Sequence, residues 1–255
     1  MVNIRKAGMK ELGTKVYRHE LKFLCEERQL RIIEDRIRHI CKPDPYAKEG
    51  GFYSVRSLYF DTYDDRCYYE NLAGVDGRRK YRIRVYNDDT DKLKLECKYS
   101  YRGRKAKEVC SIDGERYKEV LEGAGLRKSF GVQGAKRLEG ENSGGTDLLR
   151  RFLAEKYIEV LEPKAVVEYE RTPYVYGAGN VRITFDRAIR TSHQVRAFPE
   201  RSKISKGILP EGVQILEVKY DEVFPAAVRE LLTAGQDLRV ISFSKYALCR
   251  QYGYR

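Results

Sequence analysis

Basic and apolar side chains alternate in the segment 79–107, at a spacing that could bind a chain of phosphate groups. Residues 81–86 read YRIRVY and residues 92–99 read KLKLECKY, on either side of a polar turn at 87–91. Residues i, i+2 and i+4 of a β-strand share one face, so Arg82 and Arg84 point one way and Tyr81, Ile83 and Val85 the other. Two arginines at this spacing offer planar forks to successive phosphates.

The same alternation recurs on strands that are far apart in the sequence. Their charged faces carry Arg18, Glu20 and Lys22 in one strand, and Arg182, Thr184 and Asp186 or Glu217 and Lys219 in others. A single basic face is ordinarily a solvated sheet surface. Repeated basic faces with few acids instead favour a polyanion and a metal ion as ligands. Because they share strand parity, the following side chains are expected to converge on one lumen: Arg82, Arg84, Lys98, Lys107, Arg182 and Lys219.

The overall charge also indicates an anionic partner. The 255 residues include 50 Lys and Arg against 38 Asp and Glu, which gives a formal net charge of +12. Nucleic acid binding would require exposed aromatic residues within the basic patch, whereas the tyrosines are expected on the apolar face, so we predict no nucleic-acid partner. No run of 18 apolar residues and no signal-peptide pattern is present, which predicts a cytoplasmic protein without a membrane span. Six cysteines without metal-type spacing are expected to be reduced.

The elements that must position these residues are mostly strands. After an N-terminal tail at 1–14, we predict one domain over 15–255 with a mobile polar loop at 122–145. Strands are expected at 15–24, 52–60, 81–85, 93–99, 104–112, 165–176, 181–189 and 214–221. Helices are expected at 26–40, 64–72, 113–121, from Thr146 onward, 225–233 and 244–252. This order predicts an α+β fold, mainly antiparallel, closed into a barrel with charged faces inside and helices packed outside.

Several motifs together resemble a known family. They are SLYFDTYDD at 57–65, YYENLAG at 68–74, RRKYRIRVY at 78–86, KLKLECKY at 92–99, YERTPY at 169–174, VRITFD at 181–186, LEVKY at 216–220 and FSKY at 243–246. In this order they resemble the VTC (polyphosphate polymerase) domain of the triphosphate tunnel metalloenzymes, which are related to the CYTH proteins. The resemblance covers residues 15–252 except the loop at 122–145. It implies a basic tunnel that binds ATP and polyphosphate, and a divalent cation, Mn²⁺ or Mg²⁺, that assists transfer of the γ-phosphoryl group.

The resemblance also implies roles for individual residues. It assigns catalysis to Arg82, Arg84, Lys98, Glu217 and Lys219. It adds phosphate binding by Lys22, Lys107, Arg171, Arg182 and Lys245, and metal binding by Glu217 first, then by Glu96 or Glu20. Strict alternation places Arg171 opposite Glu168 and Glu170, so those acids must face outward or a bulge must intervene. Lys219 could either contact phosphate or balance the charge of Glu217.

One departure from the family pattern bears on the reaction. The hydrolytic branch of the superfamily opens with two glutamates in an ExExK strand, whereas Arg18 here stands in place of the first glutamate. This favours a polymerase over a metal-dependent triphosphatase. A binding module for polyphosphate or inositol phosphates remains a third alternative. Because the sequence lacks the membrane helices of the eukaryotic complexes, we expect a membrane-protein partner encoded by another gene.

Overall fold

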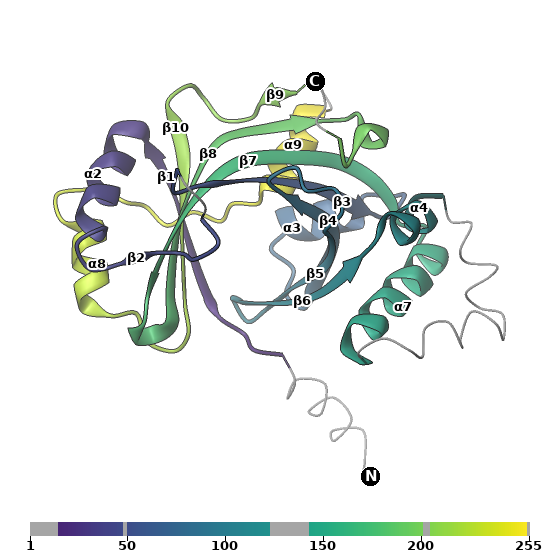
Figure 1. Ribbon diagram of the computed structural model, residues 1–255, viewed down its shortest axis with the longest axis horizontal. Helices are drawn as coiled ribbons and strands as arrows, with labels where there is room; N and C mark the ends of the chain where they lie inside the picture. Colours follow the sequence, from purple (N-terminus) through teal and green to yellow (C-terminus); the bar gives the residue numbers. More distant parts are fainter. Residues whose placement is uncertain (1–14, 48–49, 123–142, 201–204, 254–255) are drawn as a thin grey trace, which may run out of the picture.

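One antiparallel sheet dominates the computed structural model, which describes residues 15–47, 50–122, 143–200 and 205–253 (Figure 1). Its strands lie in the order β1-β10-β8-β7-β3-β4-β5-β6. They are β1 (His19–Glu26), β3 (Tyr53–Asp61), β4 (Arg78–Tyr86), β5 (Leu93–Tyr101), β6 (Arg104–Ile112), β7 (Glu162–Tyr176), β8 (Val181–Ser192) and β10 (Val213–Tyr220). Two short strands, β2 (Lys42–Pro43) and β9 (Lys206–Gly207), pair with β7 and β8. The predicted α+β, mainly antiparallel fold is confirmed.

Helices cover the curved sheet in separate groups. Figure 1 shows α2 (Glu27–Ile37) and α8 (Ala226–Thr233) at one side, and α4 (Gly114–Glu122) and α7 (Ser143–Ile158) at the other. The short helix α3 (Arg66–Leu72) follows β3, and α9 (Lys245–Gly253) is the last element of the described chain. Helix α7 begins at Ser143, so the prediction that Thr146 caps it is wrong. The predicted tail at 1–14 and most of the predicted loop at 122–145 lie outside the described residues.

Much of the outer face of the sheet is apolar, because alternate side chains of several strands point under a helix. Tyr81, Ile83 and Val85 of β4 are buried in a cluster with Leu149 and Phe152 of α7. A second cluster lies under α2 and α8 and includes Phe23, Leu216, Leu30, Ile33 and Val228. Burying this apolar face provides the main driving force for folding and turns the alternate, charged positions toward the inside.

Helix α9 is an exception to the prediction that all helices pack outside. Its side chains Tyr246, Ala247 and Cys249 cluster with Tyr59 and Tyr169. Those two tyrosines stand at odd-numbered positions of β3 and β7. Even-numbered residues of the same two strands, Leu58 and Val166, belong instead to the outer cluster under α7. Helix α9 therefore covers the inner face of the sheet, and part of the interior is apolar and filled.

The two edge strands of the curved sheet meet without a continuous ladder. Arg18 and Lys105 form one antiparallel bridge, in which each backbone nitrogen donates to the other residue's carbonyl oxygen at 2.9 Å. This bridge joins the segment before β1 to β6, but the ladder order itself ends at those two strands. The prediction of a fully closed barrel is therefore not confirmed. The sheet curls until its edges are joined by backbone hydrogen bonds at one residue pair of the described chain.

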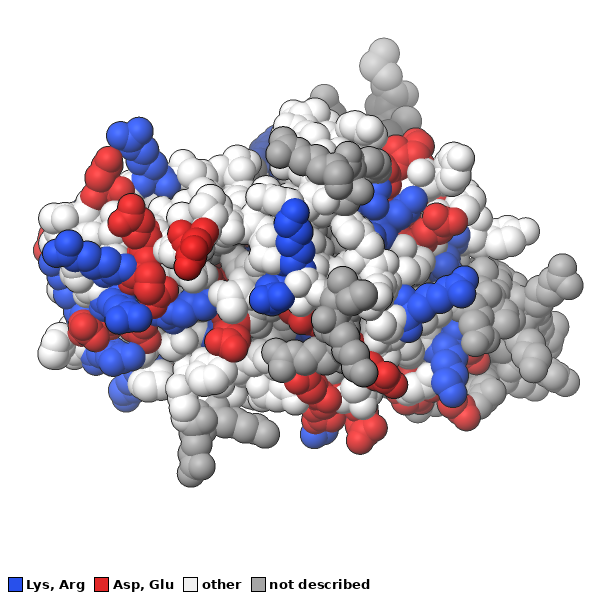
Figure 2. Space-filling view, turned by 90° about the horizontal axis from the view of Figure 1, so that it is seen from above, with Lys and Arg blue, Asp and Glu red and all other residues white. Residues whose placement is uncertain are grey.

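Charged side chains of both signs mix on the outer surface. Figure 2 shows basic and acidic groups interspersed over one face of the molecule.

No described helix is both long and apolar enough to span a bilayer. All six cysteines are free thiols, as predicted.

Helix α9 is tied to the sheet through a buried carboxylate, and this contact predicts a stability effect. Asp61 accepts hydrogen bonds from the backbone nitrogens of Thr62 and Cys67 at 2.8 Å and from the hydroxyl of Tyr246. Tyr246→Phe removes a donor from a fully buried carboxylate, so the free energy of unfolding should fall by roughly 1.5–3 kcal/mol in urea titrations. Tyr63→Phe, at an exposed site, should stay within about 0.5 kcal/mol of wild type. Equal stability of both variants would contradict the anchoring role.

Candidate functional site

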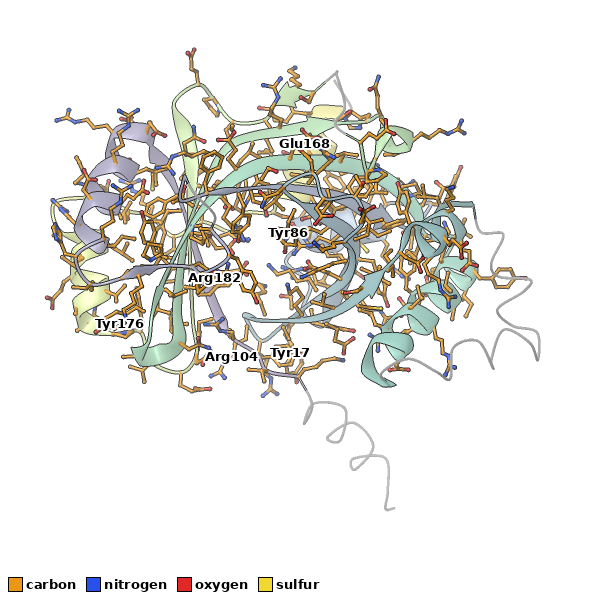
Figure 3. The ribbon with its side chains drawn as sticks, viewed as in Figure 1. Tyr17, Tyr86, Arg104, Glu168, Tyr176 and Arg182 are labelled. Carbon is orange, nitrogen blue, oxygen red and sulfur yellow. The ribbon has the colours of Figure 1, made fainter. Side chains whose placement is uncertain are left out.

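The inner face of the sheet encloses a cavity of about 650 Å³. We call it the central cavity. Fourteen lysine and arginine side chains line it, against three acids, Glu20, Asp76 and Glu217. Most lining residues come from β1, β3 to β8 and β10, and others come from α3 and from 241–245, where α9 begins. In Figure 3, Tyr86 and Arg182 point toward this space, whereas Glu168 lies on the other side of β7. Such a density of positive charge in a concave, partly dehydrated site attracts a polyanion.

The structure brings the predicted basic site residues together. The lining of the central cavity includes Lys22, Arg82, Arg84, Lys98, Lys107, Arg171, Arg182, Lys219 and Lys245, together with Glu20 and Glu217. Glu96 is fully buried behind this lining and binds two of its cations. Strand parity explains this convergence for all of them except Lys245, because each of the others stands at an inward position of its strand. Lys245 is the first residue of α9.

Glu96 organises one wall of the central cavity. Its Oε2 accepts from Nε of Arg82 at 2.7 Å and its Oε1 accepts from Nζ of Lys107 at 2.8 Å. Arg84 lies next to it, with its Nη1 3.8 Å from Oε2. Burial disfavours the ionised form of Glu96, but these three cations outweigh it and hold its pKa well below the usual range. Because both oxygens are already engaged, Glu96 holds the arginines in place.

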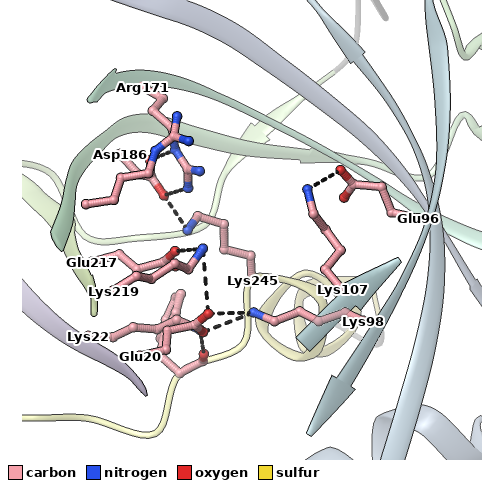
Figure 4. Close-up of polar contacts among 12 residues, drawn as sticks. Glu20, Lys22, Glu96, Lys98, Lys107, Arg171, Asp186, Glu217, Lys219 and Lys245 are labelled. Atoms are coloured by element: carbon pink, nitrogen blue, oxygen red, sulfur yellow. Dashed lines mark hydrogen bonds and ion pairs between the residues drawn. The ribbon is translucent and has the colours of Figure 1, made fainter. Parts of the chain in front are cut away.

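Glu20 and Glu217 lie on the opposite wall and share a lysine. Glu20 accepts from Lys98 at 2.9 Å and from Lys22 at 2.9 Å, and it lies 3.7 Å from Nζ of Lys219. Nζ of Lys219 is 2.6 Å from Oε1 of Glu217. Figure 4 shows Lys98 reaching across from the other wall to Glu20. Burial opposes ionisation of both acids, but the surrounding lysines keep each pKa well below its usual range.

Arg171 and Lys245 are held by an acid that the sequence analysis did not single out as a ligand. Asp186 of β8 accepts from Nε and Nη2 of Arg171 at 2.7 and 2.8 Å and from Lys245 at 2.6 Å. Arg171 faces the cavity because the neighbouring acids face outward. Glu168 binds Arg56 at 2.7 Å away from the cavity, and the β7–β8 register shifts between Glu168 and Glu170. Outward acids and a bulge were the two alternatives that strict alternation allowed, and the structure contains both.

Tyrosines of β3 and β7 contact the arginines inside the cavity, which corrects the expectation that tyrosines lie on the apolar face. The hydroxyl of Tyr59 accepts from Arg82 at 3.0 Å, and that of Tyr169 accepts from Arg84 at 3.1 Å. Tyr53 accepts from Arg182 at 3.0 Å. These tyrosines are neutral partners that orient the guanidinium groups. Part of the positive charge is balanced by acids, since Arg82 also binds Glu96 and Arg182 lies 2.9 Å from Asp44.

Lys80 is a cavity residue that the sequence analysis missed. Its Nζ donates to Oγ of Ser244 at 3.0 Å and lies 5.9 Å from the centre of the Tyr246 ring. Burial lowers its pKa to about 8, and the neighbouring Lys22 and Arg82 act in the same direction. Its position two residues before Arg82, with the same strand parity, was the available signal.

The carboxylates on the Glu217 wall fit a divalent cation that also binds phosphate. The described residues contain no group of three or more His, Cys, Asp or Glu side chains that could hold a metal ion. Glu217 and Glu20 nevertheless lie on either side of the Lys219 ammonium group, which already occupies a cation's place between two carboxylates. Mg²⁺ and Mn²⁺ accept one or two protein carboxylates when phosphate oxygens and water complete the shell. The donor set therefore suits a cation that arrives with a phosphate chain.

The lowered pKa of Lys80 predicts a proton-linked affinity. Below about pH 8 Lys80 is charged with and without ligand, so it adds no pH dependence. Above that pH the free protein must take up a proton to bind an anion such as tripolyphosphate, so affinity should fall by up to about tenfold per pH unit. Titration calorimetry at several pH values should show this fall in wild type, with proton uptake. Both should be smaller in Lys80→Met but not absent, because the pKa values of Lys98 and Lys107 in the same cavity are also lowered. Lys92→Met, at an exposed site, should behave as wild type; identical pH profiles for all three proteins would refute the linkage.

Comparison with known proteins identifies the family. The family model of the VTC domain matches residues 17–254. No curated protein matches this chain. Among solved structures, a candidate adenylyl cyclase from Hippeastrum with a dominant triphosphatase activity is 17% identical to this chain. The TM-score is 0.50, over 92% of this chain and 96% of that chain.

Two further solved structures have lower TM-scores. A candidate adenylate cyclase from Bacillus halodurans is 15% identical over 80% of this chain and 81% of that chain, with a TM-score of 0.44. The PH1819 protein from Pyrococcus horikoshii is 12% identical over 92% of this chain and 97% of that chain, with a TM-score of 0.45. At 17% identity the likeness to the Hippeastrum protein concerns the fold. The family match extends over nearly the whole chain. The chain belongs to the VTC domain family.

Proposed function

We propose that this protein transfers the γ-phosphoryl group of ATP to the end of a polyphosphate chain, with the central cavity acting as the tunnel that holds both. The observation that carries the proposal is the lining itself, in which fourteen cationic side chains surround three acids. A nucleotide base or a sugar would need fewer charges and more hydrogen-bond acceptors. A linear chain of phosphates matches a lining with cations on every wall.

The lining residues can supply what phosphoryl transfer requires from a protein. In this reaction a terminal polyphosphate oxygen forms a bond to the γ-phosphorus while the bond to the β-phosphate oxygen breaks and ADP leaves. Catalysis depends on aligning the two oxygens and stabilising charge on the transferred group. Arg82 and Arg84, held by Glu96, Tyr59 and Tyr169, offer preorganised forks on one wall. Lys98 of the same wall and Lys219 of the opposite wall offer flexible point charges.

Glu217, with Glu20 beside it, would hold the divalent cation. When bound, Mn²⁺ or Mg²⁺ would neutralise phosphate oxygens as a Lewis acid. Lys219 would exchange its contact with Glu217 for a phosphate oxygen, because its ammonium group carries the same sign of charge as the cation that replaces it. On this proposal Lys219 both balances Glu217 in the free protein and contacts phosphate in the complex.

A triphosphatase is the second candidate function, in which water takes the place of the acceptor phosphate. The likeness in fold to the Hippeastrum protein, whose reported dominant activity is a triphosphatase, supports it. The contacts of Arg18 support the polymerase instead. This residue replaces the first acid of the hydrolytic pattern, and its Nε donates to Asp221 at 2.7 Å rather than leaving a carboxylate for a second cation.

The products of ATP turnover distinguish the candidates. Purified protein incubated with ATP and Mn²⁺ should produce a ladder of polyphosphate on a gel, with ADP in matching amounts. Free phosphate without a ladder would assign the triphosphatase. Binding of polyphosphate without turnover of ATP or triphosphate, with any divalent cation, would leave only the binding module.

Two variants should separate cation binding from substrate binding. Glu217→Gln keeps the size of the side chain but removes its charge, so turnover should fall by orders of magnitude while polyphosphate affinity stays equal or increases. Arg82→Ala combined with Arg84→Ala should instead weaken polyphosphate binding, by roughly 1.5–3 kcal/mol for each lost charge-assisted hydrogen bond. Turnover and affinity are measured on the same preparations, and unfolding curves verify that the variants fold.

Matched controls exclude a general effect of charge. Glu211→Gln and Arg239→Ala change the same charges at exposed positions outside the cavity. Both should retain wild-type turnover and affinity. Full activity of Glu217→Gln with Mn²⁺ would instead move the cation site to Glu20 or Glu96.

A further inference from the structure

A buried hydroxyl beside the proposed cation site has no hydrogen-bond partner. Thr184 of β8 is 2% exposed, and its Oγ1 is one of the few buried side-chain polar atoms of the described residues that lack a partner. A buried donor without an acceptor costs free energy and is rare in folded proteins. Valine has nearly the same shape and would remove this cost. We therefore expect the hydroxyl to form a hydrogen bond in another state of the site, when a ligand is bound.

The position of Thr184 identifies Glu217 as its neighbour. Thr184 shares its strand face with Arg182 and Asp186, which point inward. It stands directly opposite Glu217 in the β8–β10 register and opposite Pro173 in the β7–β8 register. Directly paired side chains have Cβ atoms about 4.5–5.5 Å apart. Since Pro173 offers no side-chain acceptor, Glu217 is the one of its two directly paired residues that carries a side-chain acceptor for the hydroxyl.

The present partner of Glu217 is one that substrate binding would remove. Lys219 lies 2.6 Å from its Oε1, at the position that a divalent cation would take. When Lys219 turns to phosphate, Glu217 loses the contact that fixes its orientation. A carboxylate accepts hydrogen bonds at about four lone-pair sites, and a threonine hydroxyl can rotate to meet one of them.

We propose that Thr184 is a positioning residue for the divalent cation: once the cation replaces Lys219, the Thr184 hydroxyl donates a hydrogen bond to the Glu217 carboxylate and fixes the oxygen that binds the metal. This inference rests on the proposed function, which places the cation at Glu217. Metal-binding carboxylates are generally held by such hydrogen bonds, and their loss typically lowers metal affinity 10–100-fold. The small number of acids in the described site makes the orientation of each one more important.

Two substitutions separate this role from a structural one. Thr184→Val removes the hydroxyl at nearly constant volume, and Thr184→Ser keeps it. Mn²⁺ is titrated calorimetrically into protein saturated with a non-hydrolysable ATP analogue, with the titration into the analogue alone subtracted. Thr184→Val should bind Mn²⁺ about tenfold or more weakly than wild type, and Thr184→Ser should bind it nearly as tightly. The melting temperature of metal-free Thr184→Val should equal or exceed that of wild type, because an unpaired buried donor is gone.

Each alternative result has its own meaning. Unchanged Mn²⁺ affinity in Thr184→Val, with a raised melting temperature, would show that the hydroxyl is idle and overturn the inference while the proposed function stands. A lower melting temperature together with weak Mn²⁺ binding, not restored by serine, would assign a structural role and also overturn it. Absence of Mn²⁺ binding by wild type would overturn both the inference and the proposed cation site. Thr233→Val, on the exposed side of α8, should change neither quantity.

Discussion

Ion pairs between buried carboxylates and the basic lining are the interaction on which the rest of this structure depends. A buried charge is tolerated only when it is paired and hydrogen-bonded. Glu96 joins β5 to β4 and β6 through Arg82 and Lys107. Glu20 of β1 joins the other side of the cavity through Lys98 of β5. Among the described residues the backbone connects the sheet edges only by the Arg18–Lys105 bridge, so this side-chain contact also holds the curled sheet together.

The same pairs explain how an interior so rich in charge can exist before it binds anything. The acids neutralise part of the lining, and the tyrosine hydroxyls orient the arginines at no electrostatic cost. Burial lowers the pKa of Lys80 and of Lys107, so part of the remaining charge can be withheld until an anion arrives. A phosphate chain offers many oxygens to these cations and would replace the internal acids as their partners. Binding is thus an exchange of partners, which limits the cost of desolvation.

Much of this fold could be predicted from alternation alone, because parity decides which face of a strand is apolar. The strand at 104–112 matches β6 in full, and Arg82 and Arg84 face inward as expected. Contacts that depend on strand order could not be predicted. The pairing of Arg171 with Asp186 requires the β7–β8 register, and that of Lys98 with Glu20 requires the curl of the whole sheet. The packing of α9 on the inner face was also missed, because its apolar side chains fit either side of the sheet equally well.

The most direct test is a crystal structure of the wild-type protein with tripolyphosphate. We expect the phosphates to lie in the central cavity against Arg82, Arg84 and Lys98. We also expect Lys98 and Lys219 to have moved from Glu20 and Glu217 to phosphate oxygens. Glu96 should keep its contact with Arg82, because that contact positions the arginine. Tripolyphosphate bound only on an outer helix face, with the four acid–lysine contacts of Glu20 and Glu217 unchanged, would contradict the account.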